Sequence, residues 1–148
     1  MAGPAEPGGP PAEDVAVVGE AVRRQVLGDA HVDRAAAGTD GFTADFQDFI
    51  TRYAWGEIWA RPGLDRRTRS CVTLAMLAAL RCEQELGMHV RAALRNGVTV
   101  EEIKEVLLQV GIYAGLPAAN AAFAVARSAL DGGDEAAGRD EAAGRGPG

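Results

Sequence analysis

The apolar residues of this chain recur with the period of an α-helix, and no segment alternates with the period of two that marks a half-buried strand. Residues 15–130 read as a series of helices separated by glycine, proline and capping residues. About six helices are expected, over 15–27, 43–54, 66–80, 83–96, 99–113 and 117–130. Residues 29–41 are expected to form a loop with turns. We therefore predict an all-α fold.

Several residues set the expected helix boundaries. Thr43 and Asp65 can each cap the helix that follows. Thr99 is followed three residues later by a glutamate, which is the spacing of a capping box. Gly97 suits the end of a helix, and Pro117 suits the first turn of one. These signals fix the order of the helices.

The two ends of the chain differ in composition from its middle. Residues 1–14 hold four prolines and three glycines, and residues 131–148 contain Glu-Ala-Ala-Gly-Arg twice. Such segments cannot bury an apolar face, so we expect disordered tails around one folded domain at 15–130. The tails carry eight acidic and two basic residues, which accounts for the whole net charge of −6. The acidic balance therefore says nothing about the ligand of the domain.

The composition also disfavours several classes of partner. No basic stripe with interleaved aromatic residues is present, which argues against nucleic-acid binding. No signal peptide is recognisable, and no apolar run reaches the roughly 18 residues that a membrane span needs. Two cysteines are too few for a disulfide framework, so a cytoplasmic protein is expected. The apolar segments 71–80 and 106–125 exceed what so small a core can bury, which predicts a homo-oligomer.

Glu85 and His89 lie four residues apart in the predicted helix 83–96. This spacing puts a carboxylate and an imidazole on one helix face, close enough to hydrogen-bond. Such a pair can move a proton near neutral pH, although an ordinary surface pair has the same spacing. The two histidines lie in distant segments, and the acids are scattered, so no metal site is expected.

Six stretches of this sequence carry a recognisable pattern. They are LGDAHVDR at 27–34, TRYAWGEIW at 51–59, RPGLDRRTRS at 61–70, MHVRAALRNG at 88–97, EEIKEVLL at 101–108 and YAGLPAAN at 113–120. In their order and spacing, these stretches resemble the carboxymuconolactone decarboxylase family. The resemblance covers about residues 15–130 and implies an all-helical fold shared with alkylhydroperoxidase D-like proteins. It also implies a homo-oligomer, a trimer or a hexamer.

Peroxidase relatives of this fold carry Cys-x-x-Cys followed by x-x-x-His. Counted back from His89, the two cysteine positions fall on Cys82 and Glu85, so a carboxylate stands in place of the second sulfur. A glutamate that those relatives carry upstream falls on Ser70, which weakens a proton relay through that position. The resemblance thus implies a helix adapted to proton transfer, with Cys82 a small buried residue rather than a nucleophile.

The activity that the resemblance implies is decarboxylation of 4-carboxymuconolactone to 3-oxoadipate enol-lactone, in the protocatechuate branch of the β-ketoadipate pathway. This substrate carries two carboxylates and its own electron sink, the lactone carbonyl, so neither an organic cofactor nor a metal is expected. His89, oriented by Glu85, would supply the proton, and arginines would bind the carboxylates. The expected substrate-binding residues are His31, Arg52, Glu57, Arg67 and Arg69.

Other interpretations stay open at this point. Arg67 and Arg69 could form intersubunit salt bridges, and Arg52 and Glu57 could pair structurally. The whole protein could be a thiol-dependent peroxidase or reductase of the same superfamily, or a non-catalytic oligomer that binds small acids. A related carboxylated lactone could also be the substrate.

Overall fold

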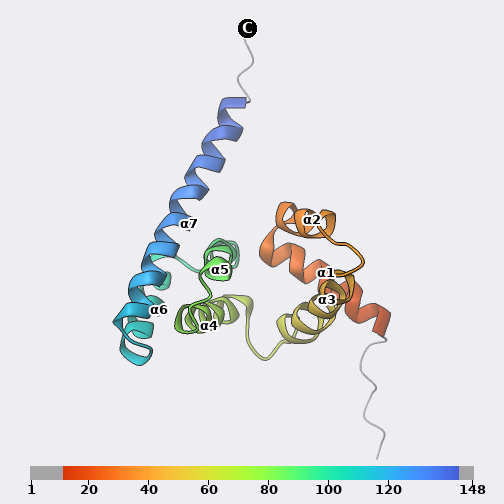
Figure 1. The fold of residues 1–148 in the computed structure, drawn as a ribbon, viewed down its shortest axis with the longest axis horizontal. Coiled ribbons are helices and arrows are strands. Elements are labelled where there is room, and N and C mark those ends of the chain that lie inside the picture. Colours follow the sequence, from red (N-terminus) through yellow and green to blue (C-terminus); the bar gives the residue numbers. More distant parts are fainter. Residues whose placement is uncertain (1–11, 144–148) are drawn as a thin grey trace, which may run out of the picture. The chain divides into compact units, whose positions relative to one another are not determined.

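The computed structural model describes the backbone of residues 12–143 and the side chains of residues 14–132. Within this part every regular element is a helix, which confirms the predicted all-α fold (Figure 1). The chain divides after Gly63 into two compact units, which we describe separately. Residues 1–11 and 144–148 lie outside the described part. The expected domain limits of 15–130, with disordered tails on both sides, therefore stay a prediction.

The first unit consists of four helical elements, and α1 packs mainly against η1. The sequence Ile50–Trp59 forms a π-helix that continues directly from the short helix before it. Trp55 lies in its buried face, 5 % exposed, with its ring centroid 5.1 Å from that of Trp59. The elements are α1 (Ala12–Leu27), α2 (Asp29–Ala37), α3 (Ala44–Phe49) and η1 (Ile50–Trp59).

Two glycines allow the backbones of α1 and η1 to approach closely. A Cβ added to Gly19 would lie 2.0 Å from the carbonyl oxygen of Thr51. A Cβ added to Gly56 would lie 2.5 Å from the carbonyl oxygen of Val15. Because both neighbours are backbone atoms, neither can move aside without shifting a helix. The crossing of α1 and η1 thus requires glycine on both sides.

Two expectations for the first unit were wrong. Residues 29–37, expected as part of a loop, form α2, which is separated from α1 by Gly28 at a φ of 87°. An acid in its first turn and a base in its last turn, Asp29 and Arg34, complement the helix dipole and favour this helix. Thr43 stands at the N-cap of α3, but its side chain makes no capping hydrogen bond. Its hydroxyl instead donates to Asp40, at 3.0 Å.

The second unit is a four-helix arrangement in which α5 packs on α4 and α7, and α6 packs on α4 and α7. Its capping signals were predicted correctly. Asp65 accepts a hydrogen bond from the Thr68 amide at 2.7 Å, and Thr99 and Glu102 form the expected capping box. The helices are α4 (Arg66–Ala79), α5 (Glu83–Arg95), α6 (Val100–Tyr113) and α7 (Leu116–Ala143). Fully buried side chains at their centre include Leu74, Leu86, Val90, Ile103 and Leu107.

The corner between α4 and α5 places a non-glycine residue in the left-handed region. Arg81 has a φ of 62°, and its amide donates to the carbonyl of Ala78 at 3.3 Å. The next amide, of Cys82, donates to the carbonyl of Leu77 at 2.9 Å. This pair of bonds is the Schellman ending that usually has glycine at the left-handed position. These two hydrogen bonds fix where α5 begins, and they keep Arg81 in a conformation that is strained for a residue with a side chain.

The last helix is longer than the sequence indicated. We expected it to end near Leu130, before two glycines, but α7 continues to Ala143. Within the described residues, no helix has the length and apolarity needed to cross a bilayer.

Candidate active site

His89 lies in the middle of α5 and is one of few polar side chains buried in the second unit, at 9 % exposure. Leu86 and Val90, which are 2 % and 0 % exposed, flank it on the same helix. The helix is strongly amphipathic, and the sequence places this imidazole on its apolar side. A histidine in such surroundings is shielded from bulk water, which suits proton transfer to a bound molecule.

Glu85 starts the same helix, one turn before His89, and its side chain is exposed. It belongs to the first turn of α5, where a negative charge is favoured by the helix dipole. The structure thus gives the carboxylate a local stabilising role at the start of α5. Its catalytic role stays a prediction.

A buried hydrogen bond joins the other end of α5 to α4. Ser70 is 1 % exposed, and its hydroxyl oxygen accepts from the Asn96 side-chain amide at 2.9 Å. Asn96 lies seven residues after His89, so the two share a helix face. The position where peroxidase relatives carry a glutamate is therefore occupied by a hydroxyl that fixes α5 against α4. The sequence did not indicate this contact, because the two residues are 26 positions apart.

The two arginines expected to bind substrate from the start of α4 differ in their surroundings. Arg67 forms an ion pair with Glu102, and its Nε donates to the carbonyl oxygen of Gly97 at 3.2 Å. These contacts tie the start of α4 to the α5–α6 turn and favour a structural role for Arg67. Arg69 is half-buried on the same helix, and it remains the better candidate for a substrate carboxylate.

The Arg67–Glu102 pair leads to a prediction about acid stability. Hydrogen bonding from the Thr99 amide, followed by the charge of Arg67, lowers the pKa of Glu102 from its ordinary value of 4.5. A lowered pKa in the folded state stabilises the protein above the ordinary pKa, and this contribution disappears as the pH falls through the folded-state value. Glu102→Gln should therefore lower the melting temperature at pH 7, with the deficit shrinking progressively below pH 4.5.

Thermal unfolding of the wild type and Glu102→Gln between pH 7 and pH 3 would measure this change. Glu105→Gln, which alters an exposed carboxylate on the same helix, is the matched control. A Glu102→Gln deficit that stays constant over the whole range would contradict the assignment.

The remaining expected substrate ligands lie in the first unit. His31 is half-buried on α2, and Glu57 is exposed on η1. Arg52, also on η1, donates from Nε to Asp48 at 2.9 Å, so its structural partner is this acid one turn earlier. The structure thus divides the expected site residues into one set on α4 and α5 and another on α2 and η1. That both sets act on one substrate stays a prediction.

One buried cation was missed altogether. Arg23 on α1 is 8 % exposed, although most arginines lie at the surface. The helical period could have indicated that Arg23 is buried, because Arg23 falls four residues after Gly19 and one after Val22, and both of these are buried.

Neither cysteine has the setting of a reactive thiol pair. Cys71 lies within α4 and Cys82 at the N-cap of α5, and both are free. Burial, followed by the charge of Glu102, raises the pKa of the Cys71 thiol and so reduces its thiolate fraction. Among the side chains that the structure describes, no group of three or more His, Cys, Asp or Glu could hold a metal ion.

Comparison with known proteins confirms the resemblance. The model of the carboxymuconolactone decarboxylase family matches residues 44–128. A 4-carboxymuconolactone decarboxylase of Acinetobacter baylyi is 56 % identical over 105 residues, which cover 71 % of this chain and 78 % of that protein. A nitrosuccinic acid decarboxylase of Metarhizium robertsii is 41 % identical over 110 residues, which cover 74 % of this chain and 77 % of that protein. The chain therefore belongs to the carboxymuconolactone decarboxylase family.

Proposed function

We propose that this protein is a carboxy-lyase that converts 4-carboxymuconolactone to 3-oxoadipate enol-lactone and carbon dioxide. The observation that carries the proposal is the 56 % identity to the Acinetobacter enzyme over most of both chains. The second relative is also a decarboxylase of a small acid, which supports the same reaction class. A buried histidine with a carboxylate one turn earlier gives this class the acid–base group that it needs.

The proposed reaction needs binding, charge stabilisation and one proton. The bond between the ring carbon and its carboxylate breaks, and the electron pair passes through the ring double bond to the lactone carbonyl oxygen. His89 in its protonated form then delivers a proton to the ring carbon next to the lactone carbonyl, so the double bond of the enol-lactone ends at the carbon that lost carbon dioxide. Solvent returns a proton to the imidazole. Glu85, one turn before His89 on the same helix, orients the imidazole, and Arg69 holds a carboxylate of the substrate. The lactone carbonyl takes up the charge, so no step requires a cofactor.

A comparison of two substrates, the acids that appear in the names of the two relatives, tests this proposal. Purified protein should be assayed with 4-carboxymuconolactone and with nitrosuccinic acid under the same conditions. We expect kcat/KM for the lactone to be at least about 100-fold higher, because only the lactone offers a conjugated carbonyl to the site. Faster turnover of nitrosuccinic acid would move the substrate assignment to that class, and turnover of neither acid would overturn the proposal.

The thiol-dependent peroxidase alternative is not favoured. It requires two sulfurs next to the histidine, and this chain has Glu85 at the second position. Cys71 is on a different helix and has a raised thiol pKa. Loss of decarboxylation in Cys82→Ser, together with peroxide consumption by the wild type, would revive this alternative.

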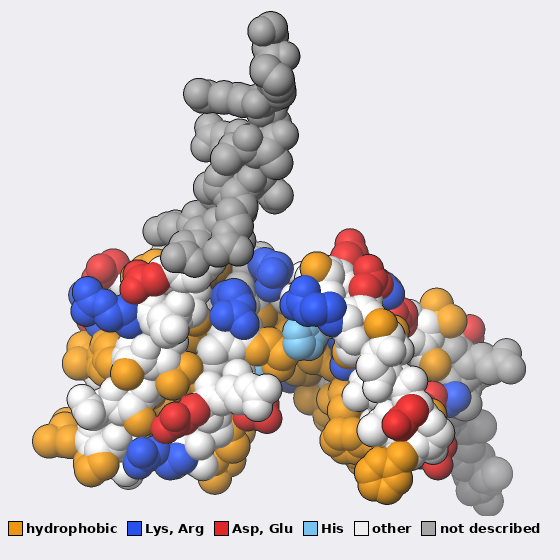
Figure 2. Space-filling view, turned by 45° about the horizontal axis from the view of Figure 1, so that its top comes forward, with side chains coloured by type: hydrophobic (Ala, Val, Ile, Leu, Met, Phe, Trp, Pro, Cys, Tyr) orange, Lys and Arg blue, Asp and Glu red, His pale blue; other side chains and the backbone are white. Residues whose placement is uncertain are grey.

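The proposed active form is a homo-oligomer, a trimer or a hexamer. One face of the second unit exposes apolar side chains from α4 and α6, and such side chains reach the surface in several places (Figure 2). Between these two helices lies a largely apolar groove of about 460 Å³. Light scattering during size exclusion would distinguish these assemblies from the 15.4 kDa chain. The most exposed apolar side chains of these two helices are those of Met76, Ile112 and Tyr113.

The remaining expectations concern the cellular setting. We propose that the enzyme acts in the protocatechuate branch of the β-ketoadipate pathway, in the cytoplasm. The identity to the Acinetobacter enzyme supports the reaction on which this placement depends.

A further inference from the structure

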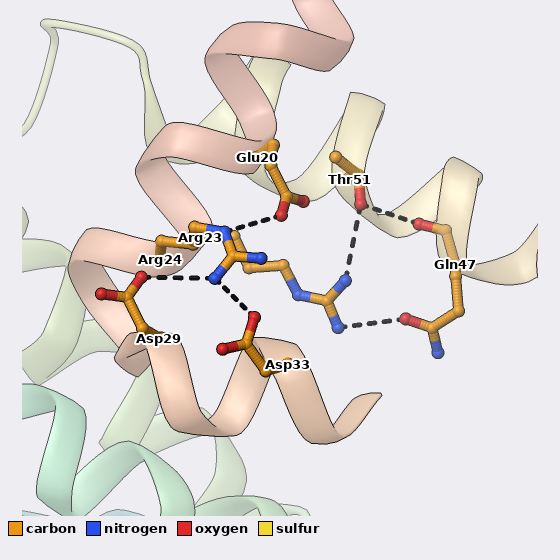
Figure 3. A network of polar contacts seen from close by, with 7 residues as sticks. All are labelled: Glu20, Arg23, Arg24, Asp29, Asp33, Gln47 and Thr51. Carbon is orange, nitrogen blue, oxygen red and sulfur yellow. Dashed lines mark hydrogen bonds and ion pairs between the residues drawn. The ribbon is translucent and has the colours of Figure 1, made fainter. Parts of the chain in front are cut away.

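A buried arginine in the first unit stands beside a small polar cavity. Arg23 and Arg24 are neighbours on α1, but Figure 3 shows their guanidinium groups pointing to different partners. Arg24 forms ion pairs with Glu20, Asp29 and Asp33, at 2.9, 3.3 and 2.8 Å. Arg23 has only neutral acceptors, since its two terminal nitrogens donate to Thr51 and Gln47.

The contacts of Arg23 leave its charge without a counterion. The hydrogen bonds to the Gln47 amide oxygen and the Thr51 hydroxyl measure 3.1 and 3.5 Å. Its Nε is buried and has no hydrogen-bond partner, and the ion pairs of the described residues do not include Arg23. Desolvation lowers the pKa of Arg23, and the charge of Glu20 only partly opposes this. A buried cation in this condition is costly unless an anion pairs with it.

The adjacent cavity has the size and the lining for a small acid. Its volume is about 290 Å³, at the lower end of the range of ligand pockets. Its polar residues come from α1, α3, η1 and the loop between α2 and α3, and Val32 and Ala36 of α2 provide an apolar side. The polar lining residues are Glu20, Arg23, Thr39, Gln47, Asp48 and Thr51.

The two acids of the lining do not neutralise Arg23. Glu20 is paired with Arg24 at 2.9 Å, and Asp48 is paired with Arg52 at 2.9 Å. These carboxylates also limit the occupant, because a second anionic group placed beside them would be repelled. The lining therefore fits one carboxylate beside Arg23, and a second carboxylate of the same acid must lie away from Glu20 and Asp48.

We propose that this cavity is a carboxylate-binding subsite for a small organic acid, with Arg23 as the residue that binds the carboxylate. Each terminal nitrogen of the guanidinium carries two N–H groups, and Gln47 or Thr51 accepts from only one of them, so each has a second donor for a carboxylate. A hydrogen bond from the charged guanidinium to a carboxylate is stronger than one to these neutral acceptors. Gln47 and Thr51 hold the two terminal nitrogens and so position the guanidinium. The proposal rests on the proposed function only for its choice of ligand class, the dicarboxylic acids.

Adipate, a six-carbon dicarboxylate that cannot be decarboxylated by this route, is the probe. It would be titrated into ¹⁵N-labelled full-length protein, with affinity measured by calorimetry and the site located by amide chemical shifts. We expect saturable binding, with the largest shifts at Arg23, Gln47 and Thr51. Arg23→Gln should weaken binding at least 10-fold. Arg34→Gln is the matched control, because Arg34 is an exposed arginine of α2 outside the cavity lining, and it should change the affinity less than 3-fold.

Further variants separate carboxylate binding by Arg23 from catalysis at His89 and from a purely structural role of Arg23. His89→Gln should lose turnover but keep the adipate-induced shifts at Arg23, Gln47 and Thr51, so a failure of catalysis and a failure of this subsite are distinguishable. Arg23→Met tests a purely structural role, because an apolar side chain of similar length removes the buried charge and keeps the packing. Adipate should raise the melting temperature of the wild type but not that of Arg23→Met. Unchanged adipate affinity in Arg23→Gln, or no binding to the wild type, would overturn the proposal.

Discussion

His89→Ala should lower kcat for 4-carboxymuconolactone at least about 100-fold, with a much smaller change in KM. The physical reason is that protonation of the ring carbon follows substrate binding, so loss of the proton donor affects the transition state more than the bound state. Because His89 is only 9 % exposed, water cannot replace the imidazole freely. Ultraviolet-monitored turnover of freshly prepared lactone would measure both constants.

Two further variants make this result interpretable. His89→Gln keeps a polar side chain of similar size, so it guards against a loss of activity caused by a cavity in the core. Glu85→Gln should reduce kcat less than His89→Ala, because an exposed carboxylate acts only through the imidazole. A His89→Ala protein with native helical content and wild-type kcat would remove His89 from the mechanism.

Gly19→Ala should destabilise the first unit by about 3 kcal/mol or more. In isolation the substitution would favour α1, because alanine is a better helix former than glycine by about 1 kcal/mol. The new Cβ, however, would lie 2.0 Å from the carbonyl oxygen of Thr51, so α1 and η1 must separate. The steric cost exceeds the gain in helix propensity, and the sign of the effect is destabilising.

Tryptophan fluorescence during urea unfolding would measure this loss of stability in the first unit. Both tryptophans of the chain, Trp55 and Trp59, lie in η1, so their signal reports on the first unit. Gly41→Ala is the matched control, because a Cβ there meets nothing within 4 Å and the residue does not have a positive φ. It should be neutral or stabilising by up to about 1 kcal/mol. Equal midpoints for the two variants would contradict the proposed close crossing.

Local signals in the sequence predicted much of the second unit. Asp65, Gly97 and the Thr99–Glu102 box stand where helices start or end, because each acts on backbone groups within a few residues of itself. The same reasoning put His89 and Glu85 on one helix. Features that depend on distant residues could not be read in this way, and the Ser70–Asn96 hydrogen bond is the clearest case.

The first unit was predicted less well, for a physical reason. The π-helix over Ile50–Trp59 has no local propensity signature, since it depends on how η1 packs against α1. Asp29 and the alanines after it favour α2, but Gly28 and the polar side chains led to the expectation of a loop. Arg23 was overlooked because an arginine in an apolar stripe is normally assumed to reach water.

The measurement that tests the central claim most directly is the stoichiometry of the reaction of the wild type with 4-carboxymuconolactone. The protein would be treated with a chelator beforehand, and a sample without protein would correct for spontaneous decay. We expect one carbon dioxide and one 3-oxoadipate enol-lactone for each lactone consumed, at a rate unaffected by the chelator. Consumption of the lactone without release of carbon dioxide, or no consumption above the control, would contradict it.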